Sequence, residues 1–459
     1  MQKEHIMQAI VIFCLLSILL VLGKVIRVGV PLLQRLYLPS SVIGGFIGLL
    51  IFQCFPNILP VEMVKMIGKL PGFLINVVFA SLFLGVVTPP LKRVFNIAFP
   101  QLCFGQVSAW GQYVIGLGIT GFILVPIFNI NPAFGNLLEI GFQGGHGTVG
   151  GMIPSFESFN WSDGIALGFT MATAGMILGI IIGMILVNWA GRKGYVANVR
   201  SFTNQDKLSQ VGIYRREDSP VAGRQTVYCD SIDSLAWHIA LIGLAVLLGY
   251  LMLIGCQKLE IAVFPEATKR LFSGFPLFPL CMIGGLLIQK AAQASKVDYL
   301  IDHAQMQRVS GAALDFLVVS AVSTIRLEVV AANWMPLLVL IIAGTVHGVV
   351  MVTFVAPKLF KEAWFECAIA DFGQALGVTA TGLLLLRTVD PESKTCAAQS
   401  FGYKQLIHEP FMGGGIWTAL ALTLVFTIGW QKVFLISGIF YVFWLIMMYI
   451  LIRRKNIAC

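Results

Sequence analysis

Charged residues are scarce in this sequence. Asp, Glu, Lys and Arg make up 12% of the 459 residues, and hydrophobic residues make up 57%, whereas a soluble domain carries about 25% charged residues. The mean hydropathy is +0.85. A water-soluble fold needs more polar residues than this chain has to cover its surface, so the composition excludes a soluble globular protein. It predicts an all-α polytopic protein surrounded by the lipid bilayer, most simply the inner (plasma) membrane.

The sequence also lacks the usual motifs of enzymes and metal sites. It contains no H-E-x-x-H, G-x-S-x-G or G-x-x-x-x-G-K-[ST] string, so no pattern indicates a serine nucleophile, a metalloprotease helix or a phosphate loop. The nine cysteines are scattered without metal-ligand spacing, and we expect free thiols and no transition metal. The net charge of +9 resides in basic residues between apolar runs, so no nucleic-acid partner is expected. The sequence predicts that the protein is not an enzyme.

Long apolar runs are abundant. About 20 apolar residues make a helix that crosses the hydrocarbon, and the first run has no small-x-small cleavage site before Lys24, so we expect a membrane span there and not a signal peptide. We expect eleven crossings, at residues 7–25, 37–55, 72–88, 103–128, 165–190, 235–254, 275–289, 311–325, 336–355, 412–430 and 433–452.

The basic residues between these runs predict the orientation. Lys and Arg concentrate on the cytoplasmic side of membrane proteins, and the distribution here, with Lys404 counted among the inner residues, favours an amino terminus outside. Residues 191–234 then form a charged cytoplasmic linker.

The two halves of the chain repeat one another. The string Pro39-Ser-Ser-Val-Ile-Gly-Gly45 returns as Pro279-Leu-Cys-Met-Ile-Gly-Gly285, and Asn76 aligns with Asp315. Five crossings separate equivalent points, so the second repeat is inverted in the membrane. The expected divisions are residues 1–190 as the first repeat, 191–234 as the linker, 235–432 as the second repeat, and 433–459 as an extra transmembrane helix with a basic tail.

Two segments are too glycine-rich and polar for lipid-facing helices, and we expect each repeat to contain one of them as a re-entrant hairpin. The first segment is residues 137–154, in which residues 141–151 include six glycines, and the second is residues 366–386. Broken helices at membrane depth persist only when buried or lining a cavity, where free N–H groups suit a carboxylate and free carbonyls suit Na⁺. The second segment offers the oxygen atoms of Asp371, Gln374, Thr379 and Thr381, which suit a hard cation. The pattern indicates a secondary carrier of an anion.

These motifs resemble those of the bacterial sodium:glutamate symporters. Gly144-Gly-His-Gly-Thr148 is similar to the first hairpin motif of that family, and Gly377-Val-Thr-Ala-Thr381 is similar to the end of the second. The resemblance implies two inverted five-helix repeats with a hairpin each, Na⁺ as the coupling ion and L-glutamate as the substrate. The Asp371-Phe-Gly373 stretch departs from the His-Cys-Gly of the family. Because a carboxylate beside an acidic substrate requires protonation or a cation, we assign Asp371 to Na⁺.

The candidate site follows from the hairpins and from ionisable groups within spans, which are costly and therefore functional candidates. For the substrate we expect Gly144, Gly145, His146, Gly147, Thr148, Gln374 and Arg326. For sodium we expect Asp371, Thr379, Thr381, Asp315 and Asn76.

Several alternatives stay open. Arg326 could serve as an interfacial anchor. Glu139, Glu157, Glu366 and Glu409 are expected at solvated helix ends, and His347 is expected to bond a neighbouring helix. The substrate could be another small carboxylate, a dicarboxylate or a hydroxy acid, with proton coupling through His146. An ion channel is disfavoured because the hairpins come as an inverted pair. A homodimer is left open.

Overall fold

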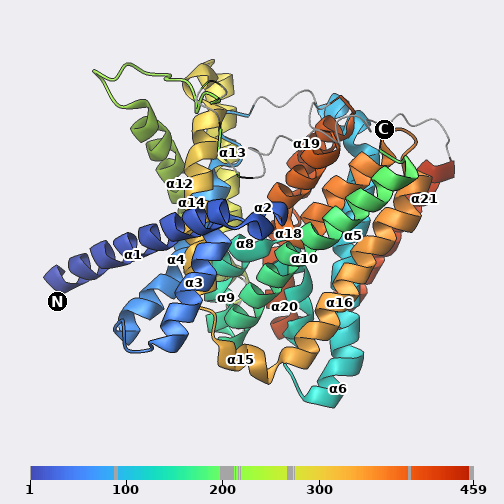
Figure 1. The fold of residues 1–459 in the computed structure, drawn as a ribbon, viewed down its shortest axis with the longest axis horizontal. Helices are drawn as coiled ribbons and strands as arrows, with labels where there is room; N and C mark the ends of the chain where they lie inside the picture. Colours follow the sequence, from blue (N-terminus) through green and yellow to red (C-terminus); the bar gives the residue numbers. More distant parts are fainter. Residues whose placement is uncertain are drawn as a thin grey trace. The chain divides into compact units, whose positions relative to one another are not determined.

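The computed structural model describes residues 2–86, 91–196, 211, 213–214, 217, 219–265, 272, 274–390 and 394–453. Throughout these ranges the regular structure is helical, with no strand (Figure 1). This confirms the all-helical class. The basic tail at residues 454–459 and part of the expected linker, including residues 197–210, lie outside the described residues.

The chain divides into two compact units, each of which draws segments from both halves of the sequence. The first unit comprises Met1–Thr88, Gly150–Ile165 and Val211–Ile325. Its helices are α1 (Gln2–Gly29), α2 (Pro31–Arg35), α3 (Ser40–Cys54), α4 (Val61–Ser81), α9 (Ile153–Ser158), α12 (Ser234–Val263), α13 (Phe278–Ala294), the 3₁₀ turn Asp298–Leu300 and α14 (His303–Ser323).

The second unit comprises Pro89–Val149, Ala166–Gln210 and Arg326–Cys459. It contains α5 (Leu91–Ile119), α6 (Val125–Phe128), the 3₁₀ turn Pro132–Asn136, α7 (Leu137–Phe142), the start of α8 (Gly145–Gly151), most of α10 (Asp163–Lys193), α15 (Leu327–Ala332), α16 (Trp334–Val350), α17 (Ala356–Leu359), α18 (Trp364–Val389), α19 (Ala397–His408), α20 (Ile416–Ile428) and α21 (Trp430–Arg453).

In the first unit, the glycine pair of α3 allows two close helix contacts. A Cβ on Gly44 would overlap the carbonyl group of Leu19 in α1, and a Cβ on Gly45 would lie 2.6 Å from the Cβ of Val322 in α14. Small residues let helices approach closely in a membrane, where packing replaces the hydrophobic drive. The pair therefore joins α3 to both neighbours.

The glycine pair of α13 does the same with its own neighbours. A Cβ on Gly284 would overlap the carbonyl of Ala245 in α12, and a Cβ on Gly285 would overlap the carbonyl of Ala80 in α4. In each pair the first glycine faces the preceding long helix and the second faces a helix from the other half of the sequence. The two pairs thus have equivalent packing within this unit.

In the second unit, two long helices end in the same way. A π-helix, Thr120–Leu124, leads from α5 into α6, and another, Met351–Val355, leads from α16 into α17. Pro126 and Pro357 stand at the second position of the short helices that follow. Because proline has no N–H to offer the carbonyl four residues earlier, the preceding turn widens.

The C-terminal helix α21 packs along α5 through glycine positions. Gly118 faces the ring of Phe434 and Gly121 faces the ring of Trp430. Trp110 of α5 stacks on Phe440, with ring centroids 4.7 Å apart and planes 12° apart. The added helix is therefore part of the packed unit.

Eight helices within the described residues are long and apolar enough to cross a membrane, fewer than the eleven expected. They are Met7–Gly29, Val61–Ser81, Ile97–Phe128, Asp163–Lys193, Ser234–Val263, Trp334–Leu359, Trp364–Val389 and Trp430–Arg453. The other expected crossings correspond to α3, α13, α14 and α20, which are too short or too polar for the same criterion. Conversely α18, where the second re-entrant hairpin is expected, is among the eight.

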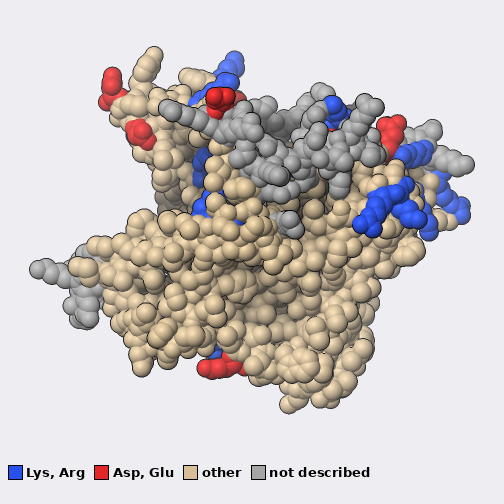
Figure 2. Space-filling view, in the orientation of Figure 1, with Lys and Arg blue, Asp and Glu red and all other residues tan. Residues whose placement is uncertain are grey.

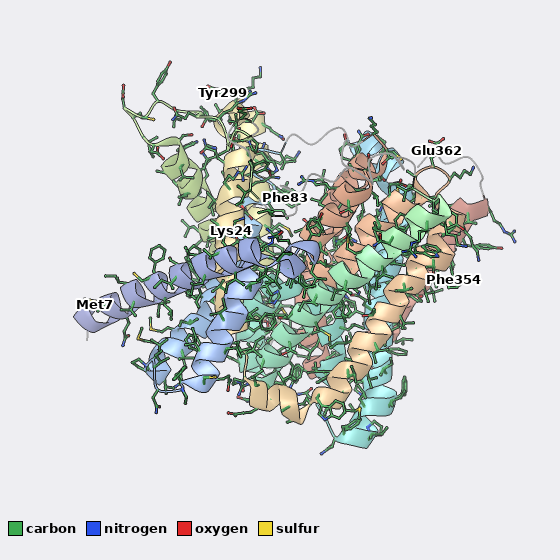
Figure 3. The ribbon with its side chains drawn as sticks, viewed as in Figure 1. Met7, Lys24, Phe83, Tyr299, Phe354 and Glu362 are labelled. Carbon is green, nitrogen blue, oxygen red and sulfur yellow. The ribbon has the colours of Figure 1, made fainter. Side chains whose placement is uncertain are left out.

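Many apolar side chains stand outward, as a bilayer requires. Most of the surface in Figure 2 is uncharged, and Met7 and Phe354, labelled in Figure 3, are 60% and 65% exposed. On α21 one stripe of the helix is exposed, comprising Leu435, Ile439, Val442, Phe443, Ile446 and Tyr449. Such a stripe suits contact with lipid chains.

The cysteines agree with expectation at most positions. Seven are free thiols: Cys14, Cys54, Cys103, Cys229, Cys256, Cys281 and Cys367. Cys396 is disulfide-bonded, so the prediction is wrong there. Cys459 lies outside the described residues.

Candidate functional site

Three helix breaks converge in the second unit. The first separates α7 from α8 at Gly144 and Gly145, the second interrupts α18 at Gly377 and Val378, and the third separates α19 from α20 at residues 409–415. Each break frees peptide N–H and C=O groups inside a mostly buried region. Such groups are costly to bury unless they find partners.

The first two breaks have the same local structure. Gly145 has a φ of 67° and Val378 a φ of 64°, both left-handed. Three residues after each, a threonine hydroxyl donates back to the carbonyl before the break: Thr148 to Gly144, over 2.9 Å, and Thr381 to Gly377. Glycine adopts this conformation freely, but a β-branched valine is strained there, and such strain clusters at functional sites.

The first two breaks also touch one another. A Cβ on Gly145 would overlap Cγ1 of Val378. The two glycine motifs, more than two hundred residues apart in the sequence, therefore contact each other. A glycine is required at residue 145 both for its φ and for this contact.

The third break is bound to the first through Glu139 of α7. This carboxylate is fully buried. It accepts hydrogen bonds from the hydroxyl of Tyr113 at 2.6 Å, the backbone N–H of Gly413 at 2.8 Å and the hydroxyl of Thr418 at 3.0 Å. Three donors compensate the buried charge. Glu139 thus connects α5, α7 and the start of α20.

The third break is bound to the second through Glu409. Its Oε1 accepts the hydroxyl hydrogen of Thr379 at 2.6 Å and an amide hydrogen of Gln405 at 2.9 Å. Gln405 also donates to the hydroxyl oxygen of Thr379. The end of α19 is therefore held against the residue that follows the break of α18.

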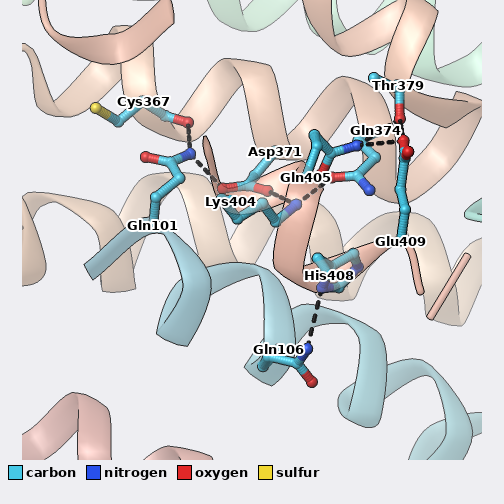
Figure 4. Close-up of polar contacts among 10 residues, drawn as sticks. All are labelled: Gln101, Gln106, Cys367, Asp371, Gln374, Thr379, Lys404, Gln405, His408 and Glu409. Atoms are coloured by element: carbon cyan, nitrogen blue, oxygen red, sulfur yellow. Dashed lines mark hydrogen bonds and ion pairs between the residues drawn. The ribbon is translucent and has the colours of Figure 1, made fainter. Parts of the chain in front are cut away.

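A buried ion pair lies one turn earlier on α19 (Figure 4). Nζ of Lys404 lies 2.6 Å from Oδ1 of Asp371, with side-chain exposures of 0% and 2%, and it also donates to Oε1 of Gln374. Gln101 donates to the other carboxylate oxygen and, at 2.8 Å, to the carbonyl of Cys367. A buried pair persists only when further hydrogen bonds satisfy both charges, and these bonds do so.

Some buried polar atoms near the breaks have no hydrogen-bond partner within the described part of the chain. They are Oε1 of Gln143, Oε1 of Gln405, Nε2 of His408 and Nε1 of Trp417. Gln143 directly precedes the first break and lies against Gly413, with a Cβ there 3.3 Å from its Cγ. Buried polar groups are nearly always bonded, so these two amide oxygens and two ring nitrogens suit a small zwitterionic or anionic ligand.

Comparison with known families decides the class. The family model described as sodium/glutamate symporter matches residues 5–392, which include the first two breaks. The chain belongs to the sodium/glutamate symporter family. Membership indicates sodium-coupled glutamate symport by a multi-pass membrane transporter, not an enzyme. Among curated proteins none matches the chain.

The symporter brings most of its predicted site residues into one unit. Gly144, Gly145, His146, Gly147, Thr148, Asp371, Gln374, Thr379 and Thr381 all belong to the second unit. The ring nitrogen Nε2 of His146 lies 2.9 Å from the hydroxyl oxygen of Thr173, whose hydrogen goes to the carbonyl of Phe169 at 2.8 Å. We therefore assign the proton to Nε2 of His146.

The other predicted site residues lie elsewhere. Asn76 and Asp315 belong to the first unit, where the amide of Asn76 donates to the carbonyl of Gly72 at 2.8 Å and Asp315 is exposed. Arg326 is exposed at the N-cap of α15.

Several expectations about charged residues of the symporter are wrong. Lys404, counted with the cytoplasmic residues, is fully buried, because Asp371 supplies the opposite charge. Glu139 and Glu366 are fully buried, and Glu409 is bonded inside the unit, so none of the three is a solvated helix end. Glu157 is exposed, as expected.

The prediction for His347 is confirmed. Its Nε2 lies 3.3 Å from the carbonyl oxygen of Ser108 in α5.

Sequence reasoning missed the whole of α19 and hence Lys404, Gln405 and His408. The available signal was the spacing: Ser400, Lys404 and His408 recur every four residues and all are buried, which places them on one helix face. Low hydropathy concealed the helix.

Proposed function

We propose that the symporter binds the glutamate that it co-transports with Na⁺ where its three helix breaks meet. The observation that carries this is the contact of the break at Gly145 with the break at Val378, together with the bonds that tie residues 409–415 to both. Discontinuous helices of secondary transporters bind anionic substrates and cations at such points.

The substrate has complementary partners there. The peptide N–H groups in the first turn of α8, residues 145–148, have no acceptor within their own helix and suit its carboxylates. Nε1 of Trp417 and Nε2 of His408 suit them as well. Its ammonium group suits the unpaired amide oxygens of Gln143 and Gln405. This division supports an amino acid over a simple dicarboxylate, because acceptors as well as donors are present.

The proposed sodium site uses the oxygen atoms around the second break. The hydroxyl of Thr381 donates to the carbonyl of Gly377, and the hydroxyl of Thr379, two residues earlier, bonds Glu409. Hard cations prefer oxygen ligands of these kinds. Asn76 and Asp315 of the first unit stay predictions for the cation path, and Arg326 stays a prediction for substrate attraction.

The proposed architecture is a pair of inverted repeats, each with a re-entrant hairpin. It is supported by the equivalent packing of Gly44-Gly45 and Gly284-Gly285 and by the paired π-helices. It is also supported by the threonine-to-carbonyl hydrogen bond that follows each of the first two breaks. On this reading α10 corresponds to the discontinuous pair α19 and α20. A homodimer stays a prediction.

Uptake into proteoliposomes tests this function. Labelled glutamate should accumulate under an inward Na⁺ gradient and should not accumulate under a proton gradient alone. Accumulation driven by protons would favour the proton-coupled alternative. Competition by unlabelled dicarboxylates and hydroxy acids would identify another small carboxylate as the substrate.

A further inference from the structure

The ammonium group of Lys404 occupies a cation position within the second unit. It lies 2.6 Å from Oδ1 of Asp371, donates to Oε1 of Gln374, and sits 5.2 Å from the ring centroid of Phe401. A carboxylate oxygen, an amide oxygen and an aromatic face are partners that a monovalent cation would also accept. Lys404 is 0% exposed, so bulk solvent does not screen the pair.

The residues around Oδ1 of Asp371 leave room for only one positive charge. The second oxygen of Asp371 is already taken by the amide of Gln101. The next residue of α19, Gln405, bonds Thr379, which carries part of the proposed sodium site. Adjacent residues of one helix thus present a charged group to Asp371 and a neutral amide to Thr379.

We propose that the Lys404 ammonium takes the place of one coupling sodium ion at Asp371. Two monovalent cations cannot share the same few oxygens in a buried site without strong repulsion. Asp371 therefore binds Na⁺ only when the ammonium is absent, and the sodium ions that travel with glutamate bind elsewhere. The inference rests on the proposed sodium-coupled transport, and it specifies how many cations that transport uses.

The test compares wild type, Lys404→Met, Asp371→Asn, and the double variant. In proteoliposomes the ratio of ²²Na⁺ flux to labelled glutamate flux is measured, and ²²Na⁺ bound per purified protein is counted by equilibrium dialysis. In Lys404→Met the Na⁺-to-glutamate flux ratio and the number of bound Na⁺ ions should each rise by one, because the carboxylate of Asp371 then takes up a sodium ion. In the double variant, which removes both charges, they should return to the wild-type values.

Asp371→Asn keeps the inference testable if Lys404→Met does not fold. Its sodium count should equal that of wild type, because no sodium binds at Asp371 while Lys404 is present. A count lower by one in Asp371→Asn, or an unchanged count in folded Lys404→Met, would overturn the inference. Failure of wild type to move glutamate with sodium would instead count against the proposed function, whereas the dialysis counts would still decide the role of Lys404.

Discussion

Thr379 donates its hydroxyl hydrogen to Oε1 of Glu409 over 2.6 Å. The bond joins the residue just after the break of α18 to the residue just after the end of α19. A ligand that drew the Thr379 oxygen toward itself would therefore act on the third break as well as the second. In the proposed site, sodium and substrate would therefore act on the same hydrogen-bonded groups, Thr379, Gln405 and Glu409.

Sodium dependence should report on the threonine oxygens. Thr379→Val and Thr381→Val remove an oxygen while nearly preserving volume, and the loss of an interaction of about 1.4 kcal/mol would raise the Na⁺ concentration for half-maximal uptake about tenfold. Thr388→Val is the matched control. Thr388 lies further along the same helix and, like Thr381, donates its hydroxyl to the carbonyl four residues before it, here at 2.9 Å. Equal Na⁺ requirements in all three variants would remove Thr379 and Thr381 from the sodium site.

The three donors around Glu139 should stabilise the fold together. Tyr113→Phe leaves a fully buried carboxylate oxygen without its 2.6 Å partner, and we expect a loss of about 1–3 kcal/mol. Thermal melting of purified Tyr113→Phe, Glu139→Gln and the double variant measures the coupling. The double variant should lose much less stability than the sum of the losses in the two single variants. Strict additivity would contradict the role of Glu139 as the common acceptor.

Gly145→Ala should impair the site for two separable reasons. A left-handed alanine costs roughly 1–2 kcal/mol, and its Cβ would overlap Val378. We expect a lower melting temperature and at least tenfold slower uptake. Gly438→Ala is the control, because it has open space on α21. Adding Val378→Gly to Gly145→Ala should restore part of the loss. No restoration would argue that the two breaks are not in contact.

Gly105→Ala should test the position of the Lys404 side chain. Alanine normally stabilises a helix by about 1 kcal/mol relative to glycine. A Cβ at Gly105 would lie 2.8 Å from Nζ of Lys404 and 3.2 Å from Oδ1 of Asp371, so the change should destabilise instead. Gly402→Ala on α19, with nothing within 4 Å, should show the ordinary gain. If both variants gain equally, Lys404 is not fixed beside Gly105.

Glycine and apolar runs allowed the sequence to predict much of this fold. The helical class followed from composition, and the glycine motifs marked two of the three breaks. At the first break the positive φ of Gly145 suits glycine, whereas at the second break the left-handed residue is Val378, beside Gly377. Helix ends were less accurate. The helix expected from residue 72 begins at Val61 with Pro71 inside it, because a membrane helix tolerates an interior proline when neighbouring groups satisfy the freed carbonyl.

The polar pairings could not be predicted from hydropathy. Lys404 lowers the hydropathy of its segment like a loop lysine, since an average over a window contains no information about Asp371, which is 33 residues away in sequence and 2.6 Å away in space. Glu139 was misjudged for the same reason. Its donors Tyr113, Gly413 and Thr418 come from distant segments, and only the tertiary fold brings them together.

The most direct test of sodium-coupled glutamate transport is the mutual effect of the two ligands at equilibrium. The glutamate dissociation constant of the purified protein is measured over a series of Na⁺ concentrations, and the Na⁺ dissociation constant is measured with and without saturating glutamate. Coupling through one site requires each ligand to tighten the other by the same factor, commonly 5–150-fold for a coupling free energy of about 1–3 kcal/mol. We expect that equality, with tighter glutamate binding as Na⁺ rises. A glutamate dissociation constant indifferent to Na⁺ would contradict the account.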